Sequence, residues 1–280
     1  MLPREPMKPF SPFAAIPLSL LVAAAVFEQL RLAVMLALLL GLVVTLLAQR
    51  GPTGRPIPGI LLVHTACLLV AINLVWDSLR LPAWLPGDAS CADVLSPFAV
   101  YRAAGAAIFL TCLLLVTLLA RAAPSEIGLR WPSRGWMVLS LGALPAIGTA
   151  AALIGPPLAE PFFGPLPSAA DDLRALIPAL LFAIANSCME ETAYRGALLR
   201  WLTPTIGVSS ALALQAVVFG LAHGVGTDFT GSPLPVMAAT AAAGLVFGAL
   251  ALRSGSLLVP IAVHIALDIP VYYGKVCLGT

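Results

Sequence analysis

The chain has 280 residues, of which 60% are hydrophobic and 10% are charged, and its formal net charge is +2. Soluble domains carry about 25% charged and about 45–50% apolar residues, so this composition excludes a soluble globular protein. The high apolar content with low net charge also excludes a disordered chain, and the small charge argues against a nucleic-acid partner, which usually requires a strongly basic face. The sequence therefore indicates an integral membrane protein.

Nine uncharged stretches predict the membrane helices. A helix needs about 20 apolar residues to cross the hydrocarbon core, and continuous Leu, Ala and Val runs lack the alternation that is typical of a transmembrane β-barrel. We therefore predict an all-α, polytopic transmembrane helical bundle with about eight or nine spans. The stretches are 9–27, 32–49, 56–76, 103–120, 135–159, 175–189, 201–227, 229–252 and 254–267.

The first two stretches leave two topologies open. They predict either a very short hairpin near Glu28 and Arg31 or one bent helix over 10–49. With the hairpin and nine crossings, loop arginines gather on the side of the N-terminus, as the positive-inside rule requires; a single bent helix reverses the orientation. In both cases we expect a multi-pass protein of the lipid bilayer, in the plasma (inner) membrane if the source is bacterial.

Charged residues interrupt the apolar segment 175–203. Such residues inside a membrane helix are expensive and mark a candidate functional site. Glu191 and Arg195 lie four residues apart, so they share a helix face and can pair. Glu190 points about 100° away from Glu191 and has no partner nearby in the sequence. The alternative interpretation places both carboxylates at a water interface, as charges at a helix end.

Two later helices each carry two residues of interest that lie one helical turn apart. Phe219 and His223 lie four residues apart, as do His264 and Asp268. We counted 1.5 Å per residue from the turns expected near Pro204 and Gly255. This places four residues in one broad layer inside the bilayer, namely Glu190, His223, His264 and Asp268. We therefore expect two carboxylates and two imidazoles to meet there.

Three motifs in this part of the chain resemble those of a known family. Residues 190–196 (EETAYRG) look like the motif EExxxR, 219–223 (FGLAH) like FxxxH, and 264–268 (HIALD) like HxxxN/D. Together, in this order on successive hydrophobic helices, they resemble the CPBP family of intramembrane proteases, which contains CAAX proteases and bacteriocin-processing enzymes. The resemblance covers about 172–273, and 126–131 (EIGLRW) is similar to a segment common upstream of that core.

The resemblance implies a division of the chain into two parts. Residues 1–121 are the N-terminal transmembrane helices, which carry no recognised motif. Residues 122–280 form a CPBP-like catalytic helical core. The implied function is that of an intramembrane endopeptidase, which hydrolyses a peptide bond near the C-terminus of a membrane-anchored or lipidated protein or peptide.

The resemblance also implies a role for each residue of the site. Glu190, desolvated within the bundle, suits a general base for water, and His223 holds or polarises that water. His264 and Asp268 face the developing oxyanion. Because the family often has Asn where this chain has Asp268, the carboxyl group either donates in its protonated form or accepts the N–H of His264 and orients the imidazole.

The remaining motif residues are expected to support the site. Glu191 and Arg195 form a structural pair, and Phe219 packs in the core. Cofactors are left open, because the resemblance permits either a glutamate-dependent or a metal-assisted mechanism. In the metal-assisted alternative, a divalent ion such as zinc binds to Glu190, His223 and His264 through N and O atoms.

Two other functions stay as alternatives. One is a catalytically idle membrane protein, such as a bacteriocin self-immunity protein or a chaperone-like partner. The other is a transporter that uses buried Glu and His as a proton relay. The complete motif set favours the enzyme, since such transporters typically have inverted repeats or paired broken helices. The substrate stays open among prenylated CAAX proteins, peptide precursors and proteins with C-terminal membrane-anchor sorting signals.

Overall fold

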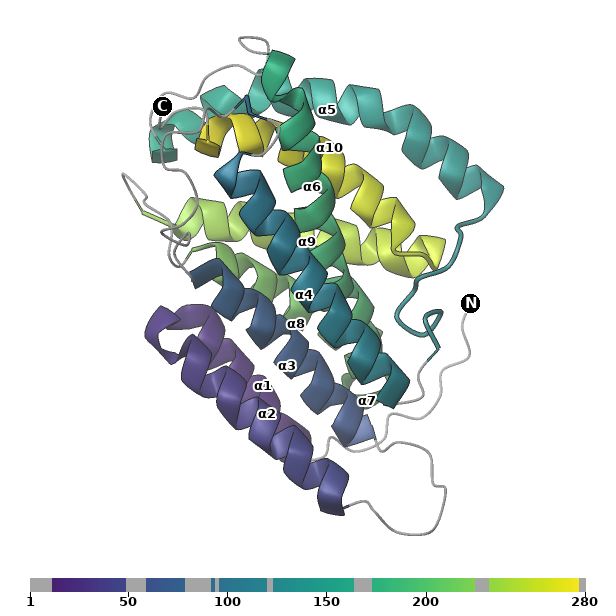
Figure 1. Cartoon of the computed structure of the whole chain (residues 1–280). Helices are drawn as coiled ribbons and strands as arrows, with labels where there is room; N and C mark the ends of the chain where they lie inside the picture. Colours follow the sequence, from purple (N-terminus) through teal and green to yellow (C-terminus); the bar gives the residue numbers. More distant parts are fainter. Residues whose placement is uncertain are drawn as a thin grey trace.

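The computed structural model describes residues 12–48, 59–78, 92–93, 96–119, 123–163, 173–224 and 232–276. Within these ranges every regular element is a helix, which confirms the predicted all-α class (Figure 1). The elements are α1 (Pro12–Val26), η1 (Glu28–Leu30), α2 (Arg31–Ala48), α3 (Gly59–Ser78), α4 (Pro97–Leu119), α5 (Arg134–Phe163), η2 (Leu173–Ala175), α6 (Leu176–Glu191), η3 (Thr192–Leu199), α7 (Arg200–Ile206), α8 (Val208–His223), α9 (Leu234–Ser254) and α10 (Leu258–Val276).

Several of these helices are suited to a lipid bilayer. Four described segments are long and apolar enough to cross a membrane, namely Glu28–Thr45, Pro97–Leu115, Arg134–Ile154 and Leu234–Ser254. Four further apolar helices are shorter, and these are Ala15–Val26, Leu61–Trp76, Val208–His223 and Leu258–Tyr273. Together they indicate an integral membrane protein, while the count of eight or nine spans stays a prediction.

Apolar side chains cover the outside of the bundle and polar ones lie inside. Leu40 on α2 and Leu139 on α5 are more than half exposed, whereas Glu191, Arg195 and Gln215 are fully buried. Lipid tails are as apolar as leucine, so outward leucines cost nothing in a membrane. Polar groups that would be unsatisfied in hydrocarbon are gathered where they can bond to one another.

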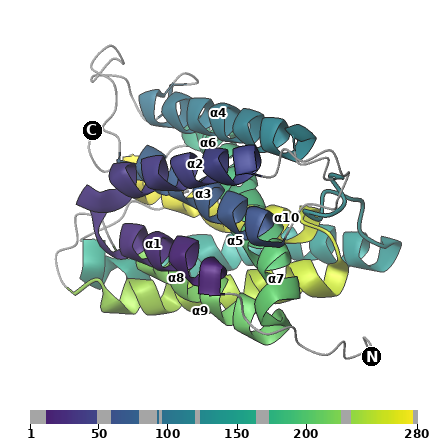
Figure 2. The same ribbon diagram turned by 90° about the horizontal axis from the view of Figure 1, so that it is seen from below.

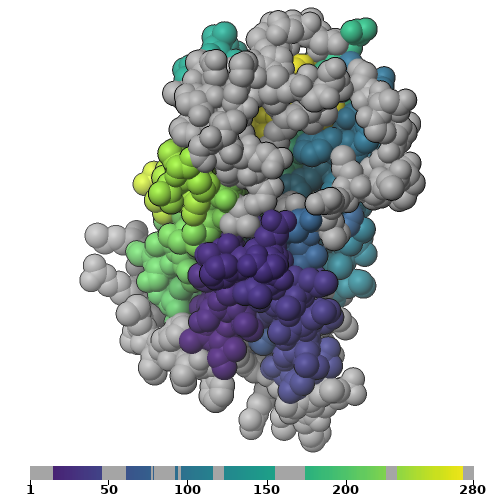
Figure 3. Space-filling view, turned by 90° about the vertical axis from the view of Figure 1, so that its left-hand side faces the viewer, coloured from purple at the N-terminus to yellow at the C-terminus, as the bar shows by residue number. Residues whose placement is uncertain are grey.

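The N-terminal segment forms a hairpin, so the alternative of one bent helix over 10–49 is wrong. The helices α1 and α2 pack against each other, joined by η1, and α1 also packs against α8. On the surface, the purple N-terminal segment lies beside the green one (Figure 3). Buried Arg31 secures the turn. Its Nε donates to Ala24 O at 3.2 Å, and one Nη donates to Leu74 O at 3.2 Å and to Ser78 Oγ at 2.6 Å. Some of the loop charges behind the predicted orientation, among them Arg50, Arg55 and Arg121, lie outside the described residues.

One long helical segment runs through the centre of the bundle. It comprises α6, the π-helix η3 and α7, and it ends at Gly207, whose φ of 81° is in the region that favours glycine. The turn expected near Pro204 lies three residues further on, at Gly207, and Pro204 itself is inside the last turns of α7. The positive φ of Gly207 allows the chain to leave the helix there.

The packing of this segment determines where the site lies. On its two sides α6 packs against α4 and α10, and α10 packs in turn against α5 (Figures 1 and 2). The π-helix η3 packs against α3 and α8. Side chains at the end of α6 therefore meet those of α4 and α10 in the interior.

The segment 126–131 fastens the turn between α9 and α10. Leu257 N donates to Gly128 O at 2.9 Å, and Ser256 Oγ donates to Arg130 O at 2.5 Å. Arg130 Nε donates to Gly255 O at 2.6 Å, which neutralises the carbonyl end of α9. The upstream segment thus holds the start of α10, the helix that carries His264.

The helices α8 and α9 approach each other closely at Gly220. A Cβ atom at this position would lie 2.5 Å from Met237 O and 2.7 Å from Ala241 Cβ. Small residues at a crossing allow backbones to come together in membrane bundles. Because one of the opposing atoms belongs to the backbone, a side chain at Gly220 would have to push the helices apart.

We predict that Gly220→Ala destabilises the protein by about 1–3 kcal/mol, the usual cost of overpacking. Gly142→Ala on α5 is the matched control, because a Cβ there meets nothing within 4 Å and alanine is the better helix former. Thermal unfolding of the two purified variants in detergent measures the difference. Equal midpoints for the two variants would contradict this account of the crossing.

Candidate active site

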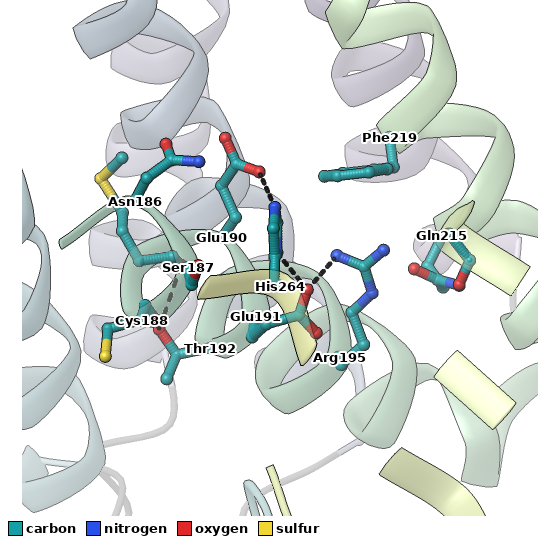
Figure 4. Close-up of polar contacts among 12 residues, drawn as sticks. Asn186, Ser187, Cys188, Glu190, Glu191, Thr192, Arg195, Gln215, Phe219 and His264 are labelled. Atoms are coloured by element: carbon teal, nitrogen blue, oxygen red, sulfur yellow. Dashed lines mark hydrogen bonds and ion pairs between the residues drawn. The ribbon is translucent and has the colours of Figure 1, made fainter. Parts of the chain in front are cut away.

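Two adjacent glutamates end α6 in the interior of the bundle. Glu190 is 4% exposed and Glu191 is fully buried. Both lie at the layer where α10 crosses, and Figure 4 shows their carboxylates on two sides of the imidazole of His264. The alternative of two helix-end charges at a water interface is therefore not supported by the burial of these side chains.

The carboxylate of Glu191 accepts hydrogen bonds from two side chains. Its Oε1 accepts from an Nη of Arg195 at 2.9 Å and from Nδ1 of His264 at 2.8 Å. The predicted contact of Glu191 with Arg195 is thus present. The contact with His264 joins α6 to α10 and was not expected from the sequence.

The second ring nitrogen of His264 faces two other carboxylates. Its Nε2 lies 3.7 Å from Glu190 Oε2 and 3.5 Å from Asp268 Oδ1. Because Nδ1 donates to Glu191, Nε2 carries the lone pair in the neutral tautomer. The distance to Glu190 is too long for a direct hydrogen bond, but a small hydrogen-bonding group can contact both atoms.

Asp268 is held from α6. Its Oδ2 accepts from Asn186 Nδ2 at 2.8 Å and from Ser187 Oγ at 3.1 Å. This oxygen therefore acts as an acceptor. The imidazole of His264 lies 2.8 Å from Glu191 Oε1 and 3.5 Å from Asp268 Oδ1, so its shorter contact is with Glu191. The structure brings Glu190, His264 and Asp268 together, as the layer arithmetic predicts.

Glu190 has a partner that lies far away in the sequence. Arg102 on α4 approaches it with an Nη 3.2 Å from Glu190 Oε1, and the Nε of the same arginine donates to Asn186 Oδ1 at 2.6 Å. The motif-free N-terminal helices thus contribute a guanidinium to the site. In the sequence this arginine is visible only as a charge near an apolar stretch.

Phe219 connects the remaining motif residues to this cluster. Its ring centroid lies 4.4 Å from that of His223 and 6.3 Å, edge-on, from that of His264. The guanidinium of Arg195 lies 4.2 Å from the same centroid, within cation–π range. His223 itself is half-buried at the end of α8, and its Nδ1 donates to Phe219 O at 2.8 Å.

Four contributors to the site were not predicted from the sequence: Arg102, Asn186, Ser187 and Phe247. Asn186 precedes Glu190 by four residues, so helical spacing could have placed it on the same face. Phe247 on α9 lies with its centroid 5.0 Å from that of His264, and no pattern distinguishes it from the other aromatic residues.

The metal-assisted alternative was tested against the positions of the side chains. Among the described residues, no three His, Cys, Asp or Glu side chains are grouped so that they could hold a metal ion. His223 contacts the cluster through Phe219 and turns its Nδ1 to the backbone. The expectation of a metalloprotease, with Glu190, His223 and His264 as zinc ligands, therefore finds no support in this arrangement.

The structure shows a bundle of apolar helices with buried glutamate and histidine side chains. Residues 172–270 match the model of the Rce1-like family, described as type II CAAX prenyl endopeptidase Rce1-like, and this confirms the resemblance found in the motifs. The family supports a CAAX-type protease and a membrane-associated, prenylated substrate. Comparisons with curated proteins and with solved structures give no match.

We predict that Arg195 contributes more to stability than Glu190. Removing one partner of a buried ion pair costs about 3–5 kcal/mol, because the other charge stays uncompensated. Arg195→Met should therefore lower the thermal midpoint in detergent far more than Glu190→Gln, which keeps a polar group in place. An equal or reversed order of the two midpoints would contradict this assignment.

Proposed function

We propose that this chain is an intramembrane endopeptidase that hydrolyses a peptide bond near the C-terminus of a prenylated, membrane-associated substrate, with Glu190 as the general base. The observation that carries the proposal is the placement of Glu190 Oε2 opposite His264 Nε2 at 3.7 Å in the buried polar layer. The match of 172–270 to the prenyl endopeptidase family supports the reaction and the substrate class.

In the proposed reaction Glu190 activates a water molecule. Glu190 Oε2 receives no hydrogen bond from the described protein groups, and buried polar atoms of this kind ordinarily bind water. The carboxylate takes one proton as the water oxygen attacks the scissile carbonyl carbon. The protonated carboxyl then delivers that proton to the leaving amine as the carbon–nitrogen bond breaks, which restores the carboxylate.

His264 serves the oxyanion in this proposal. Glu191 fixes the ring by accepting the Nδ1 hydrogen, so the direction of Nε2 is set before substrate binds. Protonated on both nitrogens, the imidazole donates from Nε2 to the negative oxygen of the tetrahedral intermediate. Preorganised donors of this kind usually contribute the largest single stabilisation in acyl-transfer chemistry.

Asp268 and His223 complete the site. Asp268 presents Oδ1 toward His264 Nε2, while its other oxygen is anchored by Asn186 and Ser187. The family motif assigns His223 the role of holding or polarising the water, and its Nδ1 donates to Phe219 O at the end of α8. Both assignments follow the family motif.

We predict that Glu190→Gln lowers kcat by about 10²–10⁴-fold, the usual contribution of a general base, and that it lowers the thermal midpoint less than Arg195→Met does, because the amide oxygen can still accept from Arg102. The assay is single-turnover cleavage of a farnesylated CAAX peptide by purified full-length protein in liposomes. Glu126→Gln is the matched control, because this carboxylate is exposed and accepts from Ala123 N near its own turn. Wild-type turnover by Glu190→Gln would refute the proposed base.

The substitution Asp268→Ala should lower kcat by roughly 10²–10³-fold, the usual cost of one oxyanion-hole group. Asp268→Asn should keep substantial activity, since the amide oxygen can still accept from Asn186 and Ser187 while the amide N–H donates into the site. Single-turnover rates of both variants test this difference. An alanine variant that cleaves as fast as wild type would exclude Asp268 from the site.

A further inference from the structure

The cation that faces Glu190 comes from outside the matched family segment. Arg102 belongs to α4, whereas the match covers 172–270. Its side chain is 14% exposed and that of Glu190 is 5% exposed, so their contact at 3.2 Å is largely shielded from solvent. In such surroundings a charge–charge contact is much stronger than on a water-facing surface.

Two different nitrogens of this arginine bind two residues of one helix face. The Nε donates to Asn186 Oδ1 at 2.6 Å, and an Nη contacts Glu190 Oε1 at 3.2 Å. Because Asn186 and Glu190 are four residues apart on α6, the planar guanidinium spans one turn of the helix. A guanidinium held by two hydrogen bonds has a fixed orientation, so it positions its partners as well as supplying a positive charge.

This orientation sets the plane of the Glu190 carboxylate. Arg102 contacts Oε1, and Oε2 is the oxygen that lies 3.7 Å from His264 Nε2. If Oε1 were not held, the carboxylate could turn about its last bond, and its plane would no longer place an oxygen opposite His264 Nε2. The contact therefore fixes the rotation of the base.

Charge balance in the layer points to the same residue. Three carboxylates, those of Glu190, Glu191 and Asp268, lie in this layer. Arg195 contacts Glu191, and His264 from α10 contacts all three. Arg102 supplies a guanidinium on the Glu190 side. Without it, Glu190 would face the carboxylates of Glu191 and Asp268 across the imidazole of His264.

The position of Arg102 is itself secured by α3. The neighbouring Tyr101 stacks on Trp76 with ring centroids 4.8 Å apart, and its hydroxyl donates to Trp76 O at 3.2 Å. Gly105, one turn further, leaves room for the same indole, because a Cβ there would lie 2.1 Å from Trp76 Nε1. These contacts fix α4 against α3 on both sides of Arg102.

We propose that Arg102 is a positioning residue that holds Glu190 as an oriented carboxylate for the attack of water. The inference rests on the proposed function, in which Glu190 is the base. Arg102 acts through Glu190 and Asn186 and does not itself contact the reacting atoms.

The test compares three variants in the farnesylated CAAX peptide assay with full-length protein in liposomes. Arg102→Gln should lower kcat by about 10²-fold, the scale on which misplaced reacting groups lose rate, with KM unchanged within about threefold. Arg102→Lys keeps the charge but cannot span both partners, so it should recover part of the rate. Arg31→Gln is the matched control, since this buried arginine also donates to backbone and hydroxyl oxygens but lies at the α1–α2 turn. It should lower the thermal midpoint and leave kcat close to wild type.

A double variant separates positioning from folding. If Arg102 acts through Glu190, adding Arg102→Gln to Glu190→Gln should leave the residual single-turnover rate unchanged, whereas a purely structural role lowers it by the same factor in both backgrounds. Wild-type kcat in Arg102→Gln, or an equal loss of kcat in Arg31→Gln, would overturn the proposal. Failure of the proposed function is distinct, because it would appear as full activity in Glu190→Gln alone.

Discussion

The buried carboxylate of Glu191 is the contact on which the rest of the site depends. One of its oxygens binds both Arg195 on the same helical segment and His264 on α10, and both Glu191 and Arg195 are excluded from solvent. An unpaired charge at this depth would be very costly, so the two helices must stay in register for the charges to remain paired. The orientation of the imidazole follows from that requirement.

Helix α4 takes part in the same pairing of buried charges. The segment matched to the family supplies three carboxylates but only Arg195 as a guanidinium within the described cluster. Helix α4 brings the second guanidinium, and the stacking of Tyr101 on Trp76 ties α4 to α3. The N-terminal helices are therefore part of the electrostatics of the site as well as of its lipid-facing surface.

The sequence predicts well those features that depend on local spacing. The pairing of Glu191 with Arg195 follows from a separation of four residues, and the all-helical class follows from the apolar runs. The contact of Glu191 with His264 could not be predicted, because the two residues are 73 positions apart and only the crossing of α6 with α10 brings them together. Arg102 is a similar case, at 88 positions from Glu190.

Errors and open alternatives in the sequence interpretation also have tertiary causes. The hairpin at Arg31 could not be decided locally, since Leu74 and Ser78, which accept its hydrogen bonds, lie on α3. The turn expected near Pro204 lies at Gly207, three residues further on, where a positive φ of 81° ends the helix. The π-helix η3 has no counterpart in the apolar pattern.

That π-helix determines the rotational phase between two parts of one continuous helix. Each turn closed by an i→i+5 bond holds one residue more than an α-helical turn, so η3 rotates α7 relative to α6. Loss of a single residue from η3 would turn α7 by roughly 100° about its axis. Trp201 and Leu202, which are now buried, would then swing away from the core while Glu190 stayed in place. The segment therefore sets the rotation at which the buried face of α7 follows the polar end of α6.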